Sequence, residues 1–264
     1  MNRILPILLI ALLLPLSAWA QSVGFVQLTS GRLKVFSDQG FKILDQPNQT
    51  LQVSADDQIQ TAQDSRATLY LTQYGNAVQL YSLSIMRVQK ADPGQTLLQV
   101  PAGKAYFKVD PLKNRAPFRV RTTNAMVGVK GTEFVVETDS RRTNLLTLKG
   151  KVTFEALNRA AQAISVSADF ASQVMETALP LTPVAVPPDQ IDSILKADTN
   201  AGWDVPGLSS GEPAPGAKKN GFQAEKARAQ VDDPLAEVSS ESTGSSYSSG
   251  PQASPVITWT ITVE

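Results

Sequence analysis

The stretch from residue 118 to residue 155 constrains the fold of this chain more than any other. Apolar and polar residues alternate through it, and short turns rich in Gly, Asp and Ser interrupt the alternation. Two glycines, Gly128 and Gly131, lie inside the first alternating run, and a polar turn at 139–142 precedes a second run that begins at Leu145. Alternation with period two, β-branched residues and short turns are typical of successive antiparallel strands.

The same pattern fills most of the chain before this stretch. Short alternating runs follow one another from Val23 to Val109, and no helical periodicity separates them. We therefore predict an all-β domain: an antiparallel two-sheet sandwich or roll, or a short solenoid-like domain. The residues expected to face inward are Val35, Leu69, Leu71, Val78, Leu80, Phe107, Val109, Phe118, Val120, Val127, Val129, Phe134, Val136, Leu146, Leu148, Val152 and Phe154.

The N-terminus has the pattern of a secretory signal peptide. A weakly basic start is followed by an apolar run from Ile4 to Leu16, and Ala18 and Ala20 give the small-x-small pattern of a cleavage site. We predict that residues 1–20 are removed and that the mature chain begins at Gln21. The run is too short and wrongly flanked for a stable membrane span, and the sequence predicts no membrane span in the mature chain. The expected location is periplasmic or secreted.

The chain after the β domain divides by composition. We assign residues 21–178 to the β domain and residues 179–198 to a Pro-rich connector that ends in a helix candidate, Asp189–Ala197. Residues 199–255 are rich in Ser, Gly, Pro, Ala and Glu, so we predict a low-complexity disordered linker. Residues 256–264 form a strand pattern, which either completes an edge of its own domain or adds to the edge of a partner.

Composition removes several classes of enzyme. The chain has no His and no Cys, which excludes a Ser-His-Asp triad, a Cys-His dyad and a zinc hydrolase, and the sequence predicts no catalytic residue, no cofactor and no metal site. Lys and Arg number 24, as do Asp and Glu, so the balanced charge does not indicate a nucleic-acid partner.

The central stretch also resembles the FecR domain family. Residues 125–134 read A-M-V-G-V-K-G-T-E-F and resemble the family's A-x-x-G-V-[RK]-G-T-x-F run, and residues 146–152 resemble its following V-x-x-L-x-G-x-V run. Further upstream, residues 51–61 and 64–69 resemble the family's L-x-x-G-D-x-I-x-T and S-x-A-x-L segments, with Asp56 where Gly is usual.

The resemblance covers roughly residues 26–154. It implies an all-β extracytoplasmic domain, found both in iron-uptake signalling proteins and in periplasmic proteins with no assigned activity. Full regulators of this kind also carry a cytoplasmic segment that holds a sigma factor, and a membrane helix. The sequence shows neither the anti-sigma nor the transmembrane segment, so direct transmission to a cytosolic sigma factor is not expected.

One turn in the central stretch concentrates polar groups. It contains Lys130, Gly131, Thr132 and Glu133, which we name as the candidate partner-binding residues. The alternative is a purely structural connection, in which the glycines relieve crowding and Glu133 pairs with Lys130. It is not a phosphate-binding loop, because no helix follows it.

Two further clusters have ordinary explanations. One is an acidic cluster with a calcium-like composition, which we interpret as turn residues because its spacing fits no calcium loop: Asp56, Asp57 and Asp64. The other is a set of tyrosines that could stack on sugar or peptide, but that are equally ordinary cross-strand residues: Tyr70, Tyr74, Tyr81 and Tyr106.

The sequence thus predicts an exported, non-enzymatic protein that acts as a binding or scaffold module in the periplasm, with an envelope protein as its partner. Two alternatives stay open. One is an envelope signalling component that senses an outer-membrane receptor, and the other is a carbohydrate- or peptidoglycan-binding module.

Overall fold

The computed structural model of the protein describes residues 22–72, 75–92, 94–111, 117–176, 178–198 and 203–208. All of them fall within residues 1–218, one of the two compact units into which the chain divides. The predicted signal peptide and the predicted strand at 256–264 lie outside the described residues.

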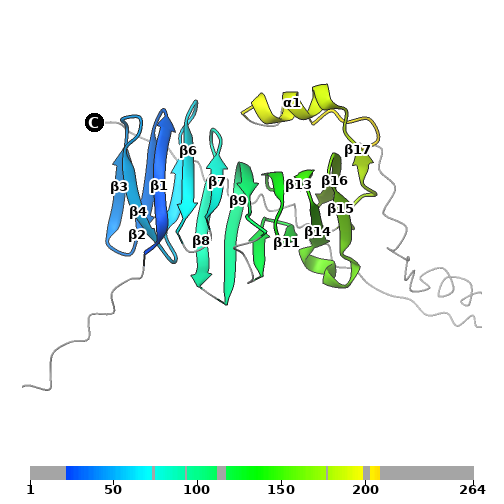
Figure 1. Ribbon diagram of the computed structural model, residues 1–264, viewed down its shortest axis with the longest axis horizontal. Helices are drawn as coiled ribbons and strands as arrows, with labels where there is room; N and C mark the ends of the chain where they lie inside the picture. Colours follow the sequence, from blue (N-terminus) through cyan, green and yellow to red (C-terminus); the bar gives the residue numbers. More distant parts are fainter. Residues whose placement is uncertain are drawn as a thin grey trace, which may run out of the picture. The chain divides into compact units, whose positions relative to one another are not determined.

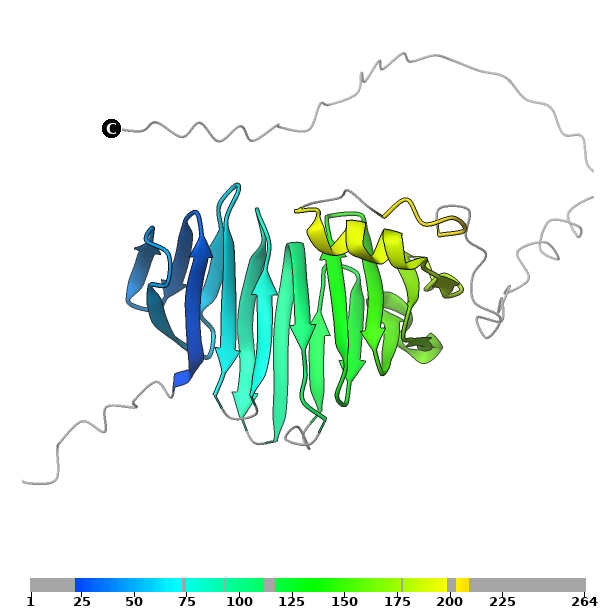
Figure 2. The same ribbon diagram turned by 45° about the horizontal axis from the view of Figure 1, so that its top comes forward.

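Two β-sheets pack face to face (Figures 1 and 2). The first, sheet A, has the order β4 (Thr50–Ser54), β1 (Ser22–Ser30), β6 (Arg66–Leu71), β7 (Asn76–Leu80), β9 (Gln95–Lys108), β12 (Glu133–Thr138), β13 (Arg142–Lys149), β16 (Phe170–Met175) and β17 (Val184–Ala185). The second, sheet B, has the order β3 (Gly40–Leu44), β2 (Leu33–Ser37), β5 (Gln58–Thr61), β8 (Ile85–Asp92), β9, β10 (Phe118–Arg121), β11 (Ala125–Val129), β14 (Lys151–Ala156) and β15 (Ile164–Ser167). The predicted all-β fold is confirmed, and β9–β10 is the one parallel pair among the described strands.

Strand β9 belongs to both sheets. Its first part, Gln95–Ala102, pairs with β8 in sheet B, and its second part, Gly103–Lys108, pairs with β12 in sheet A. The strand bends at Gly103, which has φ +92° and leaves no room for a side chain, because a Cβ there would lie 2.4 Å from Cα of Ser84. In both sheets β1 to β8 lie on one side of β9 and β10 to β17 on the other, as the colour order in Figure 1 shows.

The hydrophobic core lies between the sheets. Three aromatic rings occupy its middle: Phe107 stacks on Phe134 with ring centroids 4.7 Å apart and meets Phe118 edge-on at 6.5 Å. Because both sheets contribute fully buried side chains, such as Leu69 from sheet A and Ile59 from sheet B, the core runs the length of the sandwich. Every predicted inward-facing residue belongs to this core except Leu146 and Leu148.

The expected orientation of β13 is wrong. Leu145 faces the core between the sheets, whereas Leu146 and Leu148 face outward into a second, smaller cluster. Alternation identifies the inner face of a strand only when the outer face is polar, and β13 is apolar on both faces because another segment covers its outer side.

That segment is the C-terminal strap, defined here as residues 184–198 and 203–208. It contains β17 and the helix α1 (Pro188–Lys196), which lies over the outer face of sheet A in Figure 2. The predicted helix is present, and Pro188 lies at its start, where its missing N–H costs nothing. Ile191, Ile194 and Leu195, which share one face of the helix, pack into the second cluster. Trp203, Val205 and Leu208, from the start of the predicted linker, are also buried in this second cluster, which we call the strap cluster.

A 3₁₀ helix, η1 (Leu157–Gln162), joins β14 to β15. No helix in the part of the chain that the structure describes is long and apolar enough to cross a membrane.

Candidate functional site

The predicted binding turn connects the two sheets and divides its residues between them. Lys130 is exposed beside sheet B, whereas Glu133 begins β12 in sheet A and accepts a hydrogen bond from the Tyr106 hydroxyl at 3.0 Å. Burial first, and then Glu133, raise the pKa of Tyr106 to about 12. The structure therefore pairs Glu133 with Tyr106, in place of the Lys130–Glu133 pair considered from the sequence.

The other two residues of the turn are structural. Gly131 has φ +122°, and a Cβ on it would lie 2.2 Å from Cβ of Pro111. Thr132 is 4% exposed, and its backbone oxygen accepts a hydrogen bond from the Val109 amide at 3.0 Å. Of the four candidates, only Lys130 is exposed.

Lys130 borders a groove of about 600 Å³ on the outer face of sheet B. The groove crosses β10, β11 and β14, and we call it the sheet B groove. Its lining residues are Pro117, Phe118, Arg119, Met126, Gly128, Val129, Lys130, Lys151, Thr153 and Glu155. It therefore combines a partly apolar floor with three cations and a single carboxylate.

The groove exists because one outward position on β11 has no side chain. Gly128 pairs with Arg119 on β10 and with Thr153 on β14, so it lies in the middle of the floor. A Cβ at this glycine would meet only Cβ of Thr153, at 3.8 Å, which is an ordinary contact. Gly128 thus leaves space, whereas Gly131 lies in a position that admits no Cβ.

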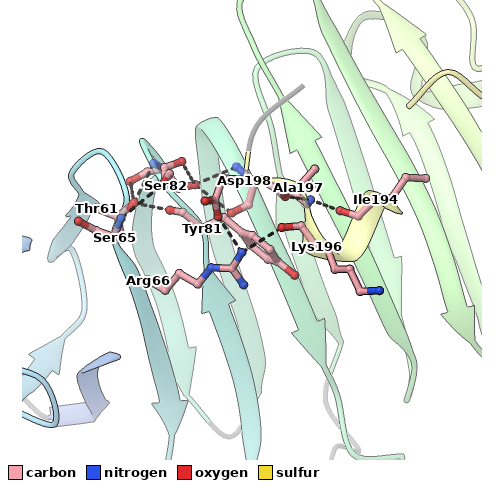
Figure 3. Close-up of polar contacts among 11 residues, drawn as sticks. Thr61, Ser65, Arg66, Tyr81, Ser82, Ile194, Lys196, Ala197 and Asp198 are labelled. Atoms are coloured by element: carbon pink, nitrogen blue, oxygen red, sulfur yellow. Dashed lines mark hydrogen bonds and ion pairs between the residues drawn. The ribbon is translucent and has the colours of Figure 1, made fainter. Parts of the chain in front are cut away.

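The outer face of sheet A is closed by the C-terminal strap. Arg66 donates to the carboxylate of Asp198 at 2.8 Å and to the carbonyl oxygen of Lys196 at 3.1 Å, and its guanidinium lies over the Tyr81 ring (Figure 3). Lys104 is fully buried, and its ammonium donates to the carbonyl oxygens of Ile194 and Ala197. Two cations thus hold the C-terminal end of α1, where the helix dipole and the free carbonyls attract positive charge.

Lys104 begins a row of buried polar side chains that runs across sheet A. Cross-strand pairing places Glu137 beside it, then Asn144, then Gln173. The Trp203 indole N–H of the strap donates to Glu137, and the Gln173 amide donates to Asn144 at 2.6 Å. Burial lowers the pKa of Lys104 to about 8, against the opposing effect of the nearby Glu137 charge.

The acidic and tyrosine clusters do not form sites. Asp56 and Asp64 have positive φ values of 70° and 54°, as turn residues do, and Asp57 accepts a hydrogen bond from the Ser54 amide at 2.8 Å. Among the described residues there is no group of three or more metal-ligating side chains.

The tyrosines do not form a common stacking face. Tyr81 is 3% exposed beneath Arg66, Tyr106 packs against the strap cluster, and Tyr70 stacks on Phe25 with ring centroids 5.0 Å apart. Tyr74 lies outside the described residues.

Sequence reasoning did not single out Arg119 and Lys151 as partners of Lys130. Both are at outward positions of alternating strands, so their exposure can be predicted from the alternation. Their proximity to Lys130 cannot be predicted from the sequence, because only cross-strand pairing brings β10, β11 and β14 together. The polar contacts beneath the strap have no sequence signal, because the residues that make them are far apart in the chain. Arg66 and Asp198, for example, are 132 positions apart.

Comparison with known proteins finds one family that part of the chain is similar to. The profile of the FecR protein family matches residues 57–153, which run from the turn before β5 into β14 and include the Gly128–Gly131 segment. No curated protein sequence matches the chain.

Two crystal structures of a "putative anti-sigma factor" from Parabacteroides distasonis, at 1.65 and 2.50 Å resolution, are similar to this chain. Each is 20% identical to it with a TM-score of 0.45 over 53% of this chain. This chain spans 65% and 64% of the length of those two chains. The family profile match is therefore the informative comparison, and it covers residues 57–153 of this protein, which are similar to the FecR protein family.

Proposed function

We propose that this is an exported, non-enzymatic FecR-domain protein that binds another protein of the cell envelope through the sheet B groove. The observation that carries the proposal is that the outer face of one sheet is covered whereas the outer face of the other is open. The strap buries the outer face of sheet A over β12, β13 and β16. Over the same half of the sandwich, sheet B has a groove of about 600 Å³ with exposed cations at its margin.

The side chains of the groove support binding in preference to catalysis. They supply cations, one carboxylate and one hydroxyl, and the chain contains neither His nor Cys. Exposed polar groups on a sheet face, around a partly apolar floor, are typical of a contact surface.

Site-specific photocrosslinking tests the proposal. A photoreactive benzophenone amino acid placed at Thr153 in the groove should give an adduct with an envelope protein in cells. The same residue placed at Lys42, which is exposed on the edge strand β3, serves as the matched control. The adduct at Thr153 should disappear when Lys130→Glu is added. No adduct, or the same adducts from both positions, would overturn the proposal.

Export is tested separately by intact mass. The sequence pattern at Ala18 and Ala20 leads us to expect that the protein in an envelope fraction begins at Gln21. A full-length species that retains residues 1–20 would contradict export by a cleaved signal peptide.

A second candidate function is an envelope signalling component, which the FecR family match favours. The two functions differ in their consequence for transcription. A signalling role predicts that Lys130→Glu changes the same set of transcripts as deletion of the gene, whereas a scaffold role predicts loss of the photocrosslink without that change. RNA sequencing of both strains separates the two.

A further inference from the structure

We infer that the sheet B groove accepts an extended, acidic segment of its protein partner. This rests on the proposed function and specifies the chemistry of the partner at that same groove. The inference follows from three properties of the groove: its charge, the position of that charge relative to the floor, and the absence of a side chain at the centre.

The charge of the groove is unbalanced. Arg119, Lys130 and Lys151 line it against a single carboxylate, Glu155, although the chain as a whole carries as many acidic as basic residues. All three cations are exposed, and none forms an ion pair with another residue of the part that the structure describes. Their charge is therefore available to a ligand, and like charges brought this close favour an anion between them.

The positions of the cations follow from the strand register. Lys130 comes directly after Val129 on β11 and Lys151 directly before Val152 on β14, and these two valines are paired, so both lysines lie at the same end of the groove. Arg119 pairs directly with Gly128 at the floor. An anionic side chain lying over Gly128 would therefore have a guanidinium beside it and two ammonium groups at one end, and Arg can bind a carboxylate with two parallel hydrogen bonds.

The open floor favours a polypeptide segment. Because Gly128 has no side chain, the backbone of β11 forms the floor, with Met126 and Thr153 at its margins. Neighbouring strands lie about 4.8 Å apart, so a groove that crosses three strands is wide enough for an extended chain with its side chains spread over it. Apolar side chains alternating with acidic ones would use both the floor and the cations.

The test uses the mature full-length protein and two fluorescent peptides of equal length. One alternates Glu with Val and the other alternates Lys with Val, and binding is followed by fluorescence anisotropy. We expect the acidic peptide to bind at least about tenfold more tightly than the basic one, and its affinity to fall as salt rises from about 0.05 M to about 0.5 M.

Three variants locate the binding. The double variant Lys130→Glu with Lys151→Glu should lose at least about tenfold in affinity for the acidic peptide, because it reverses the charge at one end of the groove. Gly128→Val should lose affinity to a similar extent by filling the floor, with an unchanged melting curve. Lys42→Glu, an equal change of charge on β3, should bind like the parent.

The outcomes decide between the possibilities. Equal binding of both peptides, or parent-like binding by both groove variants, overturns the inference. Displacement of the acidic peptide by millimolar inorganic phosphate would also overturn it, since the groove would then be a site for small anions. If the Thr153 photocrosslink forms while the acidic peptide does not bind, the inference fails and the proposed function stands. If the peptide binds but no photocrosslink forms in cells, the proposed function fails on its own.

Discussion

The outer faces of the two sheets differ in the half of the molecule that follows β9. On sheet A, β12 and β13 are buried on both faces, because the C-terminal strap covers their outer sides. On sheet B, β10, β11 and β14 alternate between buried and more exposed residues, because their outer sides carry the groove. Neighbouring strands of one sequence motif therefore have different surroundings: β12 and β13 of sheet A lie beneath the strap, whereas β10, β11 and β14 of sheet B present an open outer face.

Substitutions on the covered face should lower the free energy of unfolding, whereas substitutions in the groove should lower binding and leave stability nearly unchanged. The turn between β11 and β12 joins the two faces, and it carries the largest expected effect.

Gly131→Val should destabilise the protein by about 4 kcal/mol. The new side chain would meet Pro111 at 2.2 Å, and a β-branched residue would have to adopt a positive φ. Denaturant unfolding measures the change, and Gly128→Val in the same motif is the control. A Gly131→Val protein as stable as the parent would mean that the turn relaxes freely, and the two faces would then not be rigidly joined.

Trp203→Ala should cost about 3 kcal/mol, the usual scale for removal of a buried Trp. Trp203 is 8% exposed in the strap cluster, and its indole N–H is a hydrogen-bond partner of the buried Glu137. Limited proteolysis should then cut within residues 184–208 while the sandwich stays resistant. If the free energy of unfolding and the proteolysis pattern match those of the parent, the strap does not stabilise sheet A, and the difference expected between the two outer faces is contradicted.

The pH dependence of stability should report on Lys104. Its pKa is about 8 in the folded protein and about 10.4 in the unfolded chain, so between these values the unfolded chain binds more protons. The free energy of unfolding should therefore rise with pH from about 8 to about 10.4, by about 3 kcal/mol.

Other groups set the limits of that window. Above pH 10 the raised pKa of Tyr106, about 12, acts in the opposite sense, because the folded protein then binds more protons than the unfolded chain. Glu137, Arg66 and Asp198 act on the charge of Lys104 but do not change the sign. Unfolding titrations of Lys104→Met should lack the rise, and a rise that persists in this variant would assign it to another group.

The smallest expected effect on stability belongs to the groove. Gly128→Val should change the free energy of unfolding by less than about 0.5 kcal/mol, since the site has ordinary contact distances and a β-branched residue suits a strand. Lys130→Ala should be equally mild, because the side chain is exposed. Thermal melts beside the photocrosslinking assay test both. A large loss of stability in either variant would show that the groove contributes to the fold as the covered face does.

The strands could be predicted because each depends on local alternation, as in F-R-V-R before the turn at Thr122. The helix α1 was also readable, from Pro188 and the spacing of Ile191, Ile194 and Leu195. The facing of β13 was not, because apolar residues on both sides remove the alternation that fixes an inner face.

The candidate site was predictable in part. The turn around Lys130 and Gly131 stood out from its sequence, and the structure separates its residues into one exposed cation and three that belong to the joint between the sheets. The neighbours of Lys130 depend on strand pairing, and the strap depends on contacts between residues far apart in the chain. Neither the neighbours of Lys130 nor the strap contacts can be predicted from a local sequence pattern.

The shared strand β9 has a consequence for how the chain reaches this fold. Strands β1 to β8 assemble on one side of it and β10 to β17 on the other, and among the described residues no registered pair is further apart in sequence than Gly24 and Leu71. Low sequence separation between paired strands lowers the contact order, which speeds folding relative to β proteins with long-range pairing. The first half can therefore form its hydrogen bonds as soon as β9 is available, before the second half has folded.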